Sequence, residues 1–257
     1  AILIGLSLGL IGGGGSILTV PILVYLLGIE AAETAPAYSL FTVGIASLIG
    51  ATIKHRQGLV DVKTAIIFGV PAIVAVYVTR RYLVPAIPDE LFSIDSFTLT
   101  KRIFVMGLFA IIMILASVSM IKERKGLEDK AGERVFNYPL ILVEGLVVGV
   151  LTGVVGAGGG FIIIPALVIL SNLPMKKAIG TSLAIIAAKS LIGFLGDIAV
   201  IEIDWKVLLS FTTLAAGGIF IGHKLSSKIN GIQLKKGFGW FVLIMGVYIF
   251  TKEIFFN

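Results

Sequence analysis

Long apolar runs without a charged residue restrict most strongly what this chain can fold into. Such runs, free of Asp, Glu, Lys and Arg, lie at residues 1–29, 34–53, 64–79, 103–121, 145–175, 207–222 and 237–251. A helix that crosses a bilayer needs about 17 to 25 mostly apolar residues, and each run is near or above that length. Only 14% of the residues are charged, against about 25% in an ordinary soluble domain. The sequence therefore predicts an all-α polytopic membrane protein.

The composition also argues against several classes of function. The chain has no cysteine, which excludes disulfides and thiol chemistry. The net charge of +6 indicates membrane topology rather than a nucleic-acid surface, because the basic residues lie in short connections between apolar runs. No cluster of His, Asp and Glu has metal-ligand spacing, and no Ser, His and Asp set suggests nucleophilic catalysis. We therefore predict neither an enzyme nor a cofactor or metal.

Two glycine-rich stretches interrupt the apolar runs. LIGGGGSILTVP (residues 10–21) superposes on VVGAGGGFIIIP (residues 154–165) with an offset of 144 residues. After one gap the match continues at an offset of 143, where SLFTVGIASLIG from Ser39 pairs with SLAIIAAKSLIG from Ser182. Internal repeats of this size in an apolar chain are typical of transporters.

The repeat divides the chain into a first membrane repeat at 1–121, a charged linker at 122–138 and a second membrane repeat at 139–257. Cytoplasmic connections carry an excess of Lys and Arg, and this rule tests how the repeats are oriented. If every apolar run crosses the membrane once, the two sides receive 10 and 10 basic residues. If each glycine-interrupted run folds back as a hairpin, one side receives 14 and the other 6, and the linker is cytoplasmic. We therefore predict an inverted internal repeat, in which each half is a Gly-broken helical hairpin, re-entrant or full, followed by three transmembrane helices.

The glycine clusters are the predicted substrate site. In lipid every backbone amide needs a partner, so a broken helix is tolerated only inside protein or beside a cavity. Helices that restart at Ser16 and Phe161 would direct free N–H groups and the positive end of their dipoles towards the glycines, which favours an anion. With inverted halves the two turns would converge near the midplane, where transporters of this design bind substrate. The predicted substrate-binding residues of the turns are Gly12, Gly13, Gly14, Gly15, Ser16, Gly156, Ala157, Gly158, Gly159 and Gly160.

Other glycines have a simpler explanation. Gly5 and Gly9, like Gly149 and Gly153, follow the small-xxx-small spacing of closely packed membrane helices, and we expect them to be packing residues. Close packing is also the alternative for the two clusters, although it does not by itself require consecutive glycines followed by a proline. Soluble phosphate-binding motifs fit neither cluster, because no Gly-Lys-Ser/Thr follows.

Lys189 stands in the middle of an otherwise apolar helix predicted from about 178 to 196. A lysine inside the membrane costs at least a few kcal/mol unless it is paired or hydrated, so it is by default a functional residue. It is predicted to neutralise an anionic substrate or to carry a coupled proton. Pairing with a carboxylate such as Glu144, or snorkelling, is the alternative. The matching position of the first half is Ala46, so this charge has no twin.

Hydroxyl groups in the repeated helices extend the predicted site. Ser39, Thr181 and Ser182 are candidates to donate hydrogen bonds to substrate oxygens. The alternative for each is a helix-to-helix contact or a bond to a carbonyl of the preceding turn. Asp61 and Asp204 precede helices and are predicted to be N-caps.

The duplicated Gly-rich turn ending in proline, together with AIGTSLAIIAAKSLIG from Ala178, resembles the TauE/SafE family of sulfite and organosulfonate exporters, also called the toluene sulfonate uptake permease family. The likeness covers essentially the whole chain. The turn motif of the family matches 12–21 and 156–165, and its Gly-Thr-Ser matches 180–182, whereas the first half has Ala-Tyr-Ser there. The resemblance implies transport of a small sulfur-containing or carboxylated anion, such as sulfite, sulfoacetate or a related sulfonate, across a bacterial inner (plasma) membrane.

The predicted function is a secondary transporter of a small anion that works by alternating access around the paired turns. An anion channel, in which the same turns line a pore, is the alternative. An intramembrane enzyme lacks an obvious acid, base or metal constellation. Besides the anion and the lipid bilayer, a coupled proton and a homo-oligomer are compatible with the sequence, and no nucleic acid is expected as a partner.

Overall fold

The computed structural model is almost entirely helical. It describes residues 1–13, 15–29, 33–94, 97–122, 138–156, 159–160, 163–164, 167, 173–198, 200–226 and 231–255. Its helices are α1 (Ile2–Ile11), α2 (Ser16–Pro21), η1 (Ile22–Leu26), α3 (Thr34–Arg56), α4 (Val62–Val78), η2 (Thr79–Leu83), α5 (Val84–Ala86), α6 (Lys101–Ile121), α7 (Tyr138–Val155), α9 (Met175–Asp197), α10 (Trp205–Ser226) and α11 (Gly231–Phe255). The two strands are β1 (Glu90–Ile94) and β2 (Phe97–Thr100).

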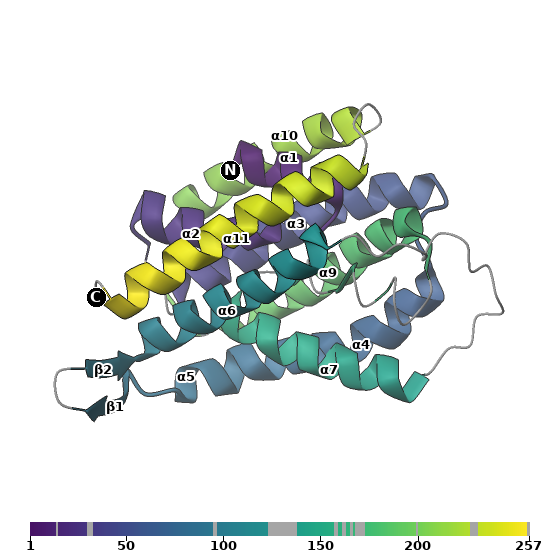
Figure 1. Ribbon diagram of the computed structural model, residues 1–257. Coiled ribbons are helices and arrows are strands. Elements are labelled where there is room, and N and C mark those ends of the chain that lie inside the picture. Colours follow the sequence, from purple (N-terminus) through teal and green to yellow (C-terminus); the bar gives the residue numbers. More distant parts are fainter. Residues whose placement is uncertain are drawn as a thin grey trace.

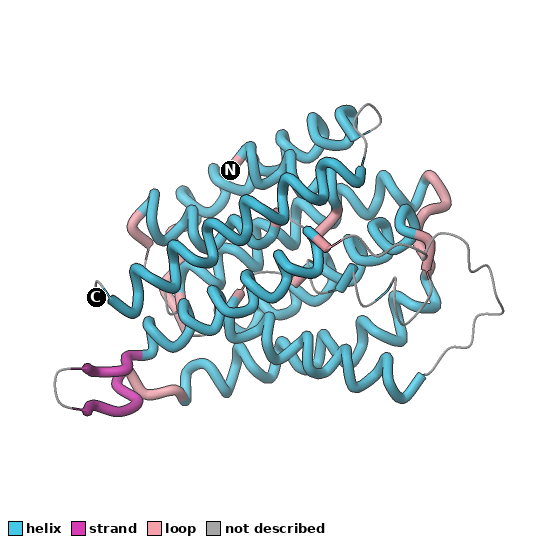
Figure 2. The backbone as a smooth tube through the Cα atoms, in the orientation of Figure 1, coloured by secondary structure: helices cyan, strands magenta, loops and turns pink. Residues whose placement is uncertain are grey.

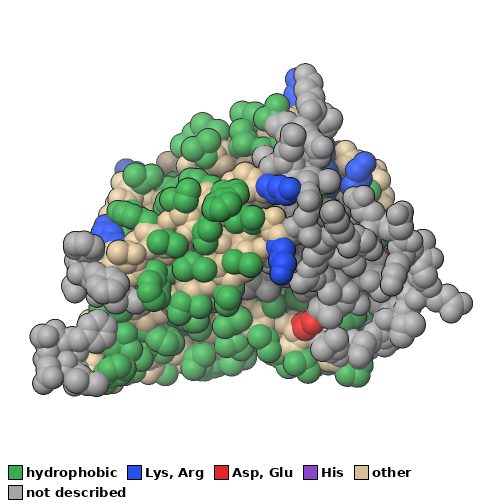
Figure 3. Space-filling view, viewed as in Figure 1, with side chains coloured by type: hydrophobic (Ala, Val, Ile, Leu, Met, Phe, Trp, Pro, Cys, Tyr) green, Lys and Arg blue, Asp and Glu red, His purple; other side chains and the backbone are tan. Residues whose placement is uncertain are grey.

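The long helices lie side by side along one common direction, so the molecule has two ends (Figure 1 and Figure 2). The end that carries β1, β2 and the last turn of α11 is called the hairpin end here. The opposite end, where α3, α6 and α10 finish and α9 and α11 begin, is called the linker end. On the face seen in Figure 3, hydrophobic side chains are spread over the described surface between the two ends. Exposed residues such as Val70, Leu115 and Ile244 show that α4, α6 and α11 present apolar side chains outwards, as helices in contact with lipid do.

Several helices are long and apolar enough to cross a membrane. In the part of the chain that the structure describes, four qualify by length and composition, at Thr34–Arg56, Val62–Ala86, Lys176–Asp197 and Trp205–Leu225. The spans in α3 and α9 are each 67% buried inside the protein, whereas those in α4 and α10 are each 39% buried. Therefore α3 and α9 form the centre of the bundle, and the predicted class of an all-α membrane protein is confirmed.

The central helices α3 and α9 run antiparallel. Gly44 of α3 faces Leu191 of α9, Gly50 faces Leu183, and Leu40 faces Gly193. In these contacts the residue number rises along α3 while it falls along α9. The helices α6 and α11 are also antiparallel, because Gly246 packs near Ile114 while Glu253 pairs with Arg102.

Two further helix pairs are parallel, and each pair joins the N-terminal half of the chain to the C-terminal half. Gly149 of α7 packs so closely on α4 that an added methyl carbon would lie 2.6 Å from the carbonyl oxygen of Ala72. Gly5 of α1 packs in the same way on the carbonyl of Ala215 in α10. Gly5 and Gly149 are equivalent in the repeat, as are Ala72 and Ala215. The predicted packing role of Gly5 and Gly149 is confirmed, because a larger residue would separate the helices.

Side-chain caps fix where several helices begin. The Asp61 carboxylate accepts a hydrogen bond from the backbone N–H of Thr64 at 2.9 Å. The Asp204 carboxylate accepts one from Val207 at 3.2 Å, so both predicted N-caps are confirmed. The hydroxyl of Thr100 caps α6 in the same way.

Two local features were not predicted from the sequence. β1 and β2 pair as an antiparallel hairpin in the register Ser93 to Thr98 and Ile94 to Phe97, between the apolar runs 64–79 and 103–121. The segments η1 and η2 are π-helical, and such turns are frequent at functional sites.

Candidate functional site

The first glycine cluster reverses the chain. Gly12 ends α1 with φ 87°, a left-handed conformation that favours glycine, and its N–H bonds to the carbonyl of Leu8 at 2.8 Å. A methyl carbon added to Gly15 would lie 2.5 Å from the Ile4 carbonyl oxygen and 2.7 Å from the Leu8 nitrogen. These residues would be more than 10 Å apart in one straight helix. The chain therefore folds back, and α2 starts beside α1, where the Ser16 hydroxyl bonds the Gly13 carbonyl at 2.8 Å.

The second cluster begins with the same kind of turn. Gly156 follows α7 with φ 73°, and its N–H bonds to the carbonyl of Thr152 at 2.8 Å, as Gly12 bonds to Leu8. Gly159 has φ 67° and packs on the Thr152 side chain. The predicted residues Gly14, Ala157 and Gly158 lie outside the residues that the structure describes.

The two turns meet each other. A methyl carbon added to Gly13 would lie 2.5 Å from the Cα of Gly160, and one added to Gly160 would lie 2.9 Å from the Gly13 carbonyl oxygen. The backbones of the two turns are thus in direct contact. Only residues without a side chain allow this approach.

Lys189 reaches the second turn from α9. Its side chain is fully buried, and its Nζ donates a hydrogen bond to the Thr152 hydroxyl at 2.7 Å. The same Nζ would lie 2.8 Å from a methyl carbon on Gly159, so the ammonium lies against this turn. Thr152 was not predicted. A signal was present, because its partner in the repeat is Leu8, and Lys189 likewise replaces Ala46.

The predicted hydroxyls divide into two groups. The Ser182 hydroxyl donates to the Ile179 carbonyl at 2.9 Å, and the Thr181 hydroxyl accepts the N–H of Asp61 at 2.8 Å. Both therefore make the structural contacts given above as their alternative. Ser39 is different, since it is fully buried and its hydroxyl has no partner among the described residues. Ser47 and Ser190, which are equivalent in the repeat, share that condition on the same two central helices.

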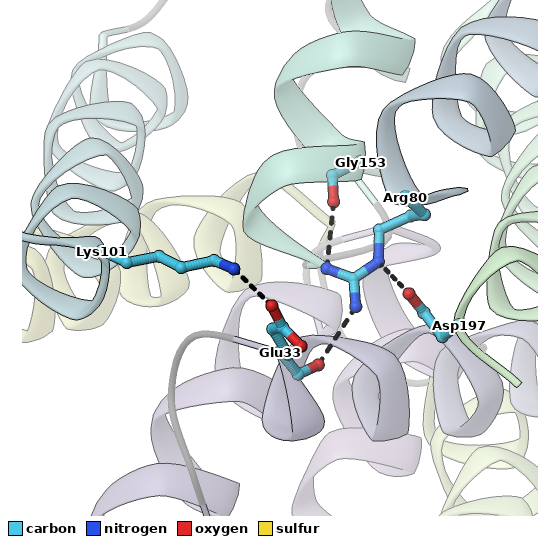
Figure 4. Close-up of polar contacts among 5 residues, drawn as sticks. All are labelled: Glu33, Arg80, Lys101, Gly153 and Asp197. Atoms are coloured by element: carbon cyan, nitrogen blue, oxygen red, sulfur yellow. Dashed lines mark hydrogen bonds and ion pairs between the residues drawn. The ribbon is translucent and has the colours of Figure 1, made fainter. Parts of the chain in front are cut away.

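An ionic cluster at the hairpin end was not predicted (Figure 4). Arg80 of η2 is only 1% exposed, and its Nε donates to the Asp197 carboxylate at 2.6 Å. Its Nη2 donates to the carbonyl oxygen of Glu33 at 3.1 Å, and its Nη1 to that of Gly153 at 3.4 Å. The Glu33 carboxylate pairs with Lys101. Five elements, α3, η2, α6, α7 and α9, are thereby tied together at one end of the bundle.

The polar groups around the turns suit an anion better than a cation. A buried ammonium beside glycine backbone forms charge-assisted hydrogen bonds with oxyanions. Among the residues that the structure describes, no group of three His, Cys, Asp and Glu side chains is placed to hold a metal ion.

Long apolar helices, four of which in the described part of the chain could each cross a membrane, define a polytopic helical membrane protein. The chain belongs to the TauE/SafE family, since residues 1–249 match the family described as "Sulfite exporter TauE/SafE". The resemblance stated from the motifs is therefore confirmed. The protein is an integral membrane transporter and not an enzyme. This agrees with the predicted location in a bacterial inner (plasma) membrane.

The sequences of several membrane transporters are similar to this chain over most of its length. The chain is 25% identical to a "Probable membrane transporter protein" of Xylella fastidiosa, over 98% of this chain and 92% of that protein. It is 30% identical to the "Probable membrane transporter protein YunE" of Bacillus subtilis, over 86% of this chain and 82% of that protein. The similarly named YdhB of the same organism is 27% identical, over 91% and 90%. No solved structure matches the chain.

Proposed function

We propose that the protein is a secondary transporter that binds a small oxyanion where its two glycine turns meet. Sulfite, sulfoacetate and related sulfonates are the proposed substrates. The observation that carries this proposal is the fully buried side chain of Lys189, whose Nζ lies beside Gly159. Its hydrogen-bond partner, the Thr152 hydroxyl, orients the amino group but carries no charge to neutralise it. A buried cation needs a counter-charge, and a bound oxyanion supplies one.

The proposed site is completed by backbone and hydroxyl groups. Backbone N–H groups of the turns are proposed donors to the anion, because glycine has no side chain to keep a ligand away from the backbone. The Ser39 hydroxyl, which has no partner in the described part of the chain, is a further proposed donor. Gly14, Ala157 and Gly158 belong to the same two turns and are part of the proposal. Thr181 and Ser182 remain candidates in second place, because their hydroxyls already have protein partners.

We further propose that the halves form an inverted repeat, with 1–121 and 139–257 as the repeats and 122–138 as a cytoplasmic linker. The antiparallel course of the equivalent helices α3 and α9 supports it, because a parallel repeat would make them parallel. Reciprocal contacts support it as well. The Thr181 hydroxyl bonds the Asp61 N–H at 2.8 Å, and the equivalent Tyr38 hydroxyl bonds the Asp204 N–H at 2.6 Å. In this arrangement each half contributes a Gly-broken hairpin and three spanning helices, and the linker end faces the cytoplasm.

Transport by alternating access follows from this arrangement. Two inverted halves around one central site can each open towards one side of the membrane. A channel would instead keep the turns open to both sides at once. Saturable transport that is accelerated by substrate on the opposite side distinguishes a transporter from a channel.

The test of the function is uptake of labelled sulfite into proteoliposomes, with unlabelled sulfonates, sulfate and short carboxylates as competitors, with and without a pH gradient. Saturable uptake that a subset of these anions inhibits is expected. Folded, inserted protein that neither takes up nor binds any of them would refute the proposal.

The role of Lys189 is tested by Lys189→Gln, with Lys206→Gln as the matched control, because Lys206 is exposed at the start of α10. Loss of one charge-assisted contact should weaken sulfite binding by about 10- to 100-fold in the first variant and leave the second unchanged. Equal affinities in the two variants would place the anion elsewhere.

The inverted repeat is tested by single cysteines in this cysteine-free chain. Lys63 and Lys206 are equivalent and exposed, so Lys63→Cys and Lys206→Cys should react with an impermeant thiol reagent from opposite sides of the membrane. Labelling of both from the same side would end the inverted arrangement.

A further inference from the structure

The two ends of the bundle carry opposite electrostatics at equivalent positions. At the hairpin end, Arg80, Asp197 and Glu33 come together in the cluster of Figure 4. The offset of 143 residues gives their counterparts at the linker end as His223, Lys54 and Lys176. Both acids are thus replaced by lysines, and the arginine by a histidine. We call Lys54, Lys176 and His223 the basic triad.

The fold brings the basic triad together. The Cβ of Lys54 would lie 3.2 Å from a methyl carbon on Gly180, one turn beyond Lys176 on α9. Gln57, in the same turn of α3 as Lys54, lies with its Nε2 3.3 Å from the Nε2 of His223 on α10. The last turn of α3 is therefore flanked by basic groups on two neighbouring helices.

The two ends differ in charge because of these differences between equivalent positions. At the hairpin end the carboxylates of Asp197 and Glu33 lie beside the cations Arg80 and Lys101 and neutralise them. At the linker end the cations Lys54 and Lys176 share one region with His223, and the triad itself contains no carboxylate. Like charges at short range repel, and a small anion between them removes the repulsion. An anion can thus take the place that a carboxylate holds at the other end.

The basic triad also lies on the way to the glycine turns. A methyl carbon on Gly12 would meet the Ile179 side chain at 2.6 Å, and Ile179 precedes Gly180, which contacts Lys54. The first turn is thus about one helical turn inwards from the triad. Lys54 and His223 are partly buried and Lys176 is exposed, so the group reaches from the surface towards the turn.

From this geometry we propose that Lys54, Lys176 and His223 form a second anion site, at which a small oxyanion docks at the linker end before it reaches the glycine turns. This inference rests on the proposed function for the identity of the transported anion, and on the described contacts for its position. Such a site raises the local anion concentration at its own end of the protein only. The neutral cluster at the hairpin end has no equivalent effect.

The test is the side-dependence of transport in the double variant Lys54→Gln/Lys176→Gln. In proteoliposomes of known orientation, the KM for sulfite supplied at the linker end should rise about tenfold, equivalent to about 1.4 kcal/mol. The kcat, and the KM for sulfite supplied at the hairpin end, should stay as in the wild type. The control is Lys224→Gln, which removes one exposed charge beside His223 and should change neither value. An unchanged linker-end KM in the double variant would overturn the proposal and leave the lysines as topology anchors.

A second variant covers the case in which the double variant does not fold. Lys54→Asp places a carboxylate at the position equivalent to Asp197. This carboxylate should pair with Lys176 and His223, so that no anion docks at the linker end. Full linker-end affinity in Lys54→Asp would equally overturn the proposal.

Direct binding separates this inference from the proposed function. In Lys189→Gln the central site is weakened, and titration with sulfite should show residual binding that disappears when Lys54→Gln and Lys176→Gln are added. If the wild type transports nothing but this residual binding is present, the function is wrong and the second site stands. If transport occurs but the residual binding is absent, the second site is wrong and the function stands.

Discussion

The contact between the two glycine turns makes Gly13 sensitive to a one-carbon substitution. In Gly13→Ala the new methyl carbon would lie 2.5 Å from the Cα of Gly160. Carbon atoms pack at about 3.5 to 4.0 Å, so the turns must separate by about 1 Å or more. Overpacking of this kind costs about 1 to 3 kcal/mol. For a chain of this size each kcal/mol corresponds to about 2 to 4 °C in melting temperature, which predicts a loss of about 2 to 12 °C.

The assay is thermal unfolding of the detergent-purified protein, with Gly217→Ala as the matched control. Gly217 lies in α10, and a methyl carbon there would meet nothing within 4 Å. Its replacement should be neutral or stabilise the helix by up to about 1 kcal/mol. The same two preparations are then titrated with sulfite, because separated turns should also bind the anion more weakly.

Equal melting temperatures for Gly13→Ala and Gly217→Ala would refute the reasoning, since the backbones of the turns could then not be in contact. A lower melting temperature with unchanged sulfite affinity would support the contact between the turns. It would also show that the turns do not bind the anion.

Three further predictions concern single substitutions of polar residues inside the bundle or at its end. Asp197→Ala leaves the Arg80 guanidinium buried without its carboxylate and should lower the unfolding free energy by about 3 to 5 kcal/mol, measured by denaturant or thermal unfolding. Tyr38→Phe removes the acceptor of the Asp204 N–H, and because Asp204 is exposed to water the loss should cost only about 0.5 to 1.5 kcal/mol in the same assay. Ser39→Ala should leave stability unchanged or slightly higher, because its hydroxyl has no described partner, while sulfite affinity falls. Unchanged affinity in that variant would take Ser39 out of the proposed site.

The sequence was sufficient for features that depend on local composition and on the repeat. Charge-free runs predicted membrane helices, and small-residue spacing predicted the packing of Gly5 and Gly149 on their neighbours. Asp61 and Asp204 were predicted as N-caps because a cap involves only residues within one turn. Such contacts are short in sequence and need no knowledge of the tertiary arrangement.

Contacts between distant segments could not be predicted in the same way. Arg80 and Asp197 are 117 residues apart, and each alone is only a charge near the end of an apolar helix. The sequence makes Thr181 a candidate for substrate contact, whereas in the structure its hydroxyl accepts the N–H of Asp61, 120 residues away. Lys189 was identified because a charge inside an apolar helix is locally conspicuous, but its partner Thr152 was found only once α7 and α9 were placed together.

The pairing of α1 with α10 has a consequence for how the protein is made. α1 packs on a helix whose residues are translated about 200 positions later, as the contact of Gly5 with Ala215 shows. At about 5 to 20 residues per second, α1 waits about 10 to 40 s in the membrane before its partner exists. The N-terminal half therefore cannot complete its own packing during synthesis. α4 likewise waits for α7, so assembly of the two halves and folding of each half are one event, finished only after α10 is inserted.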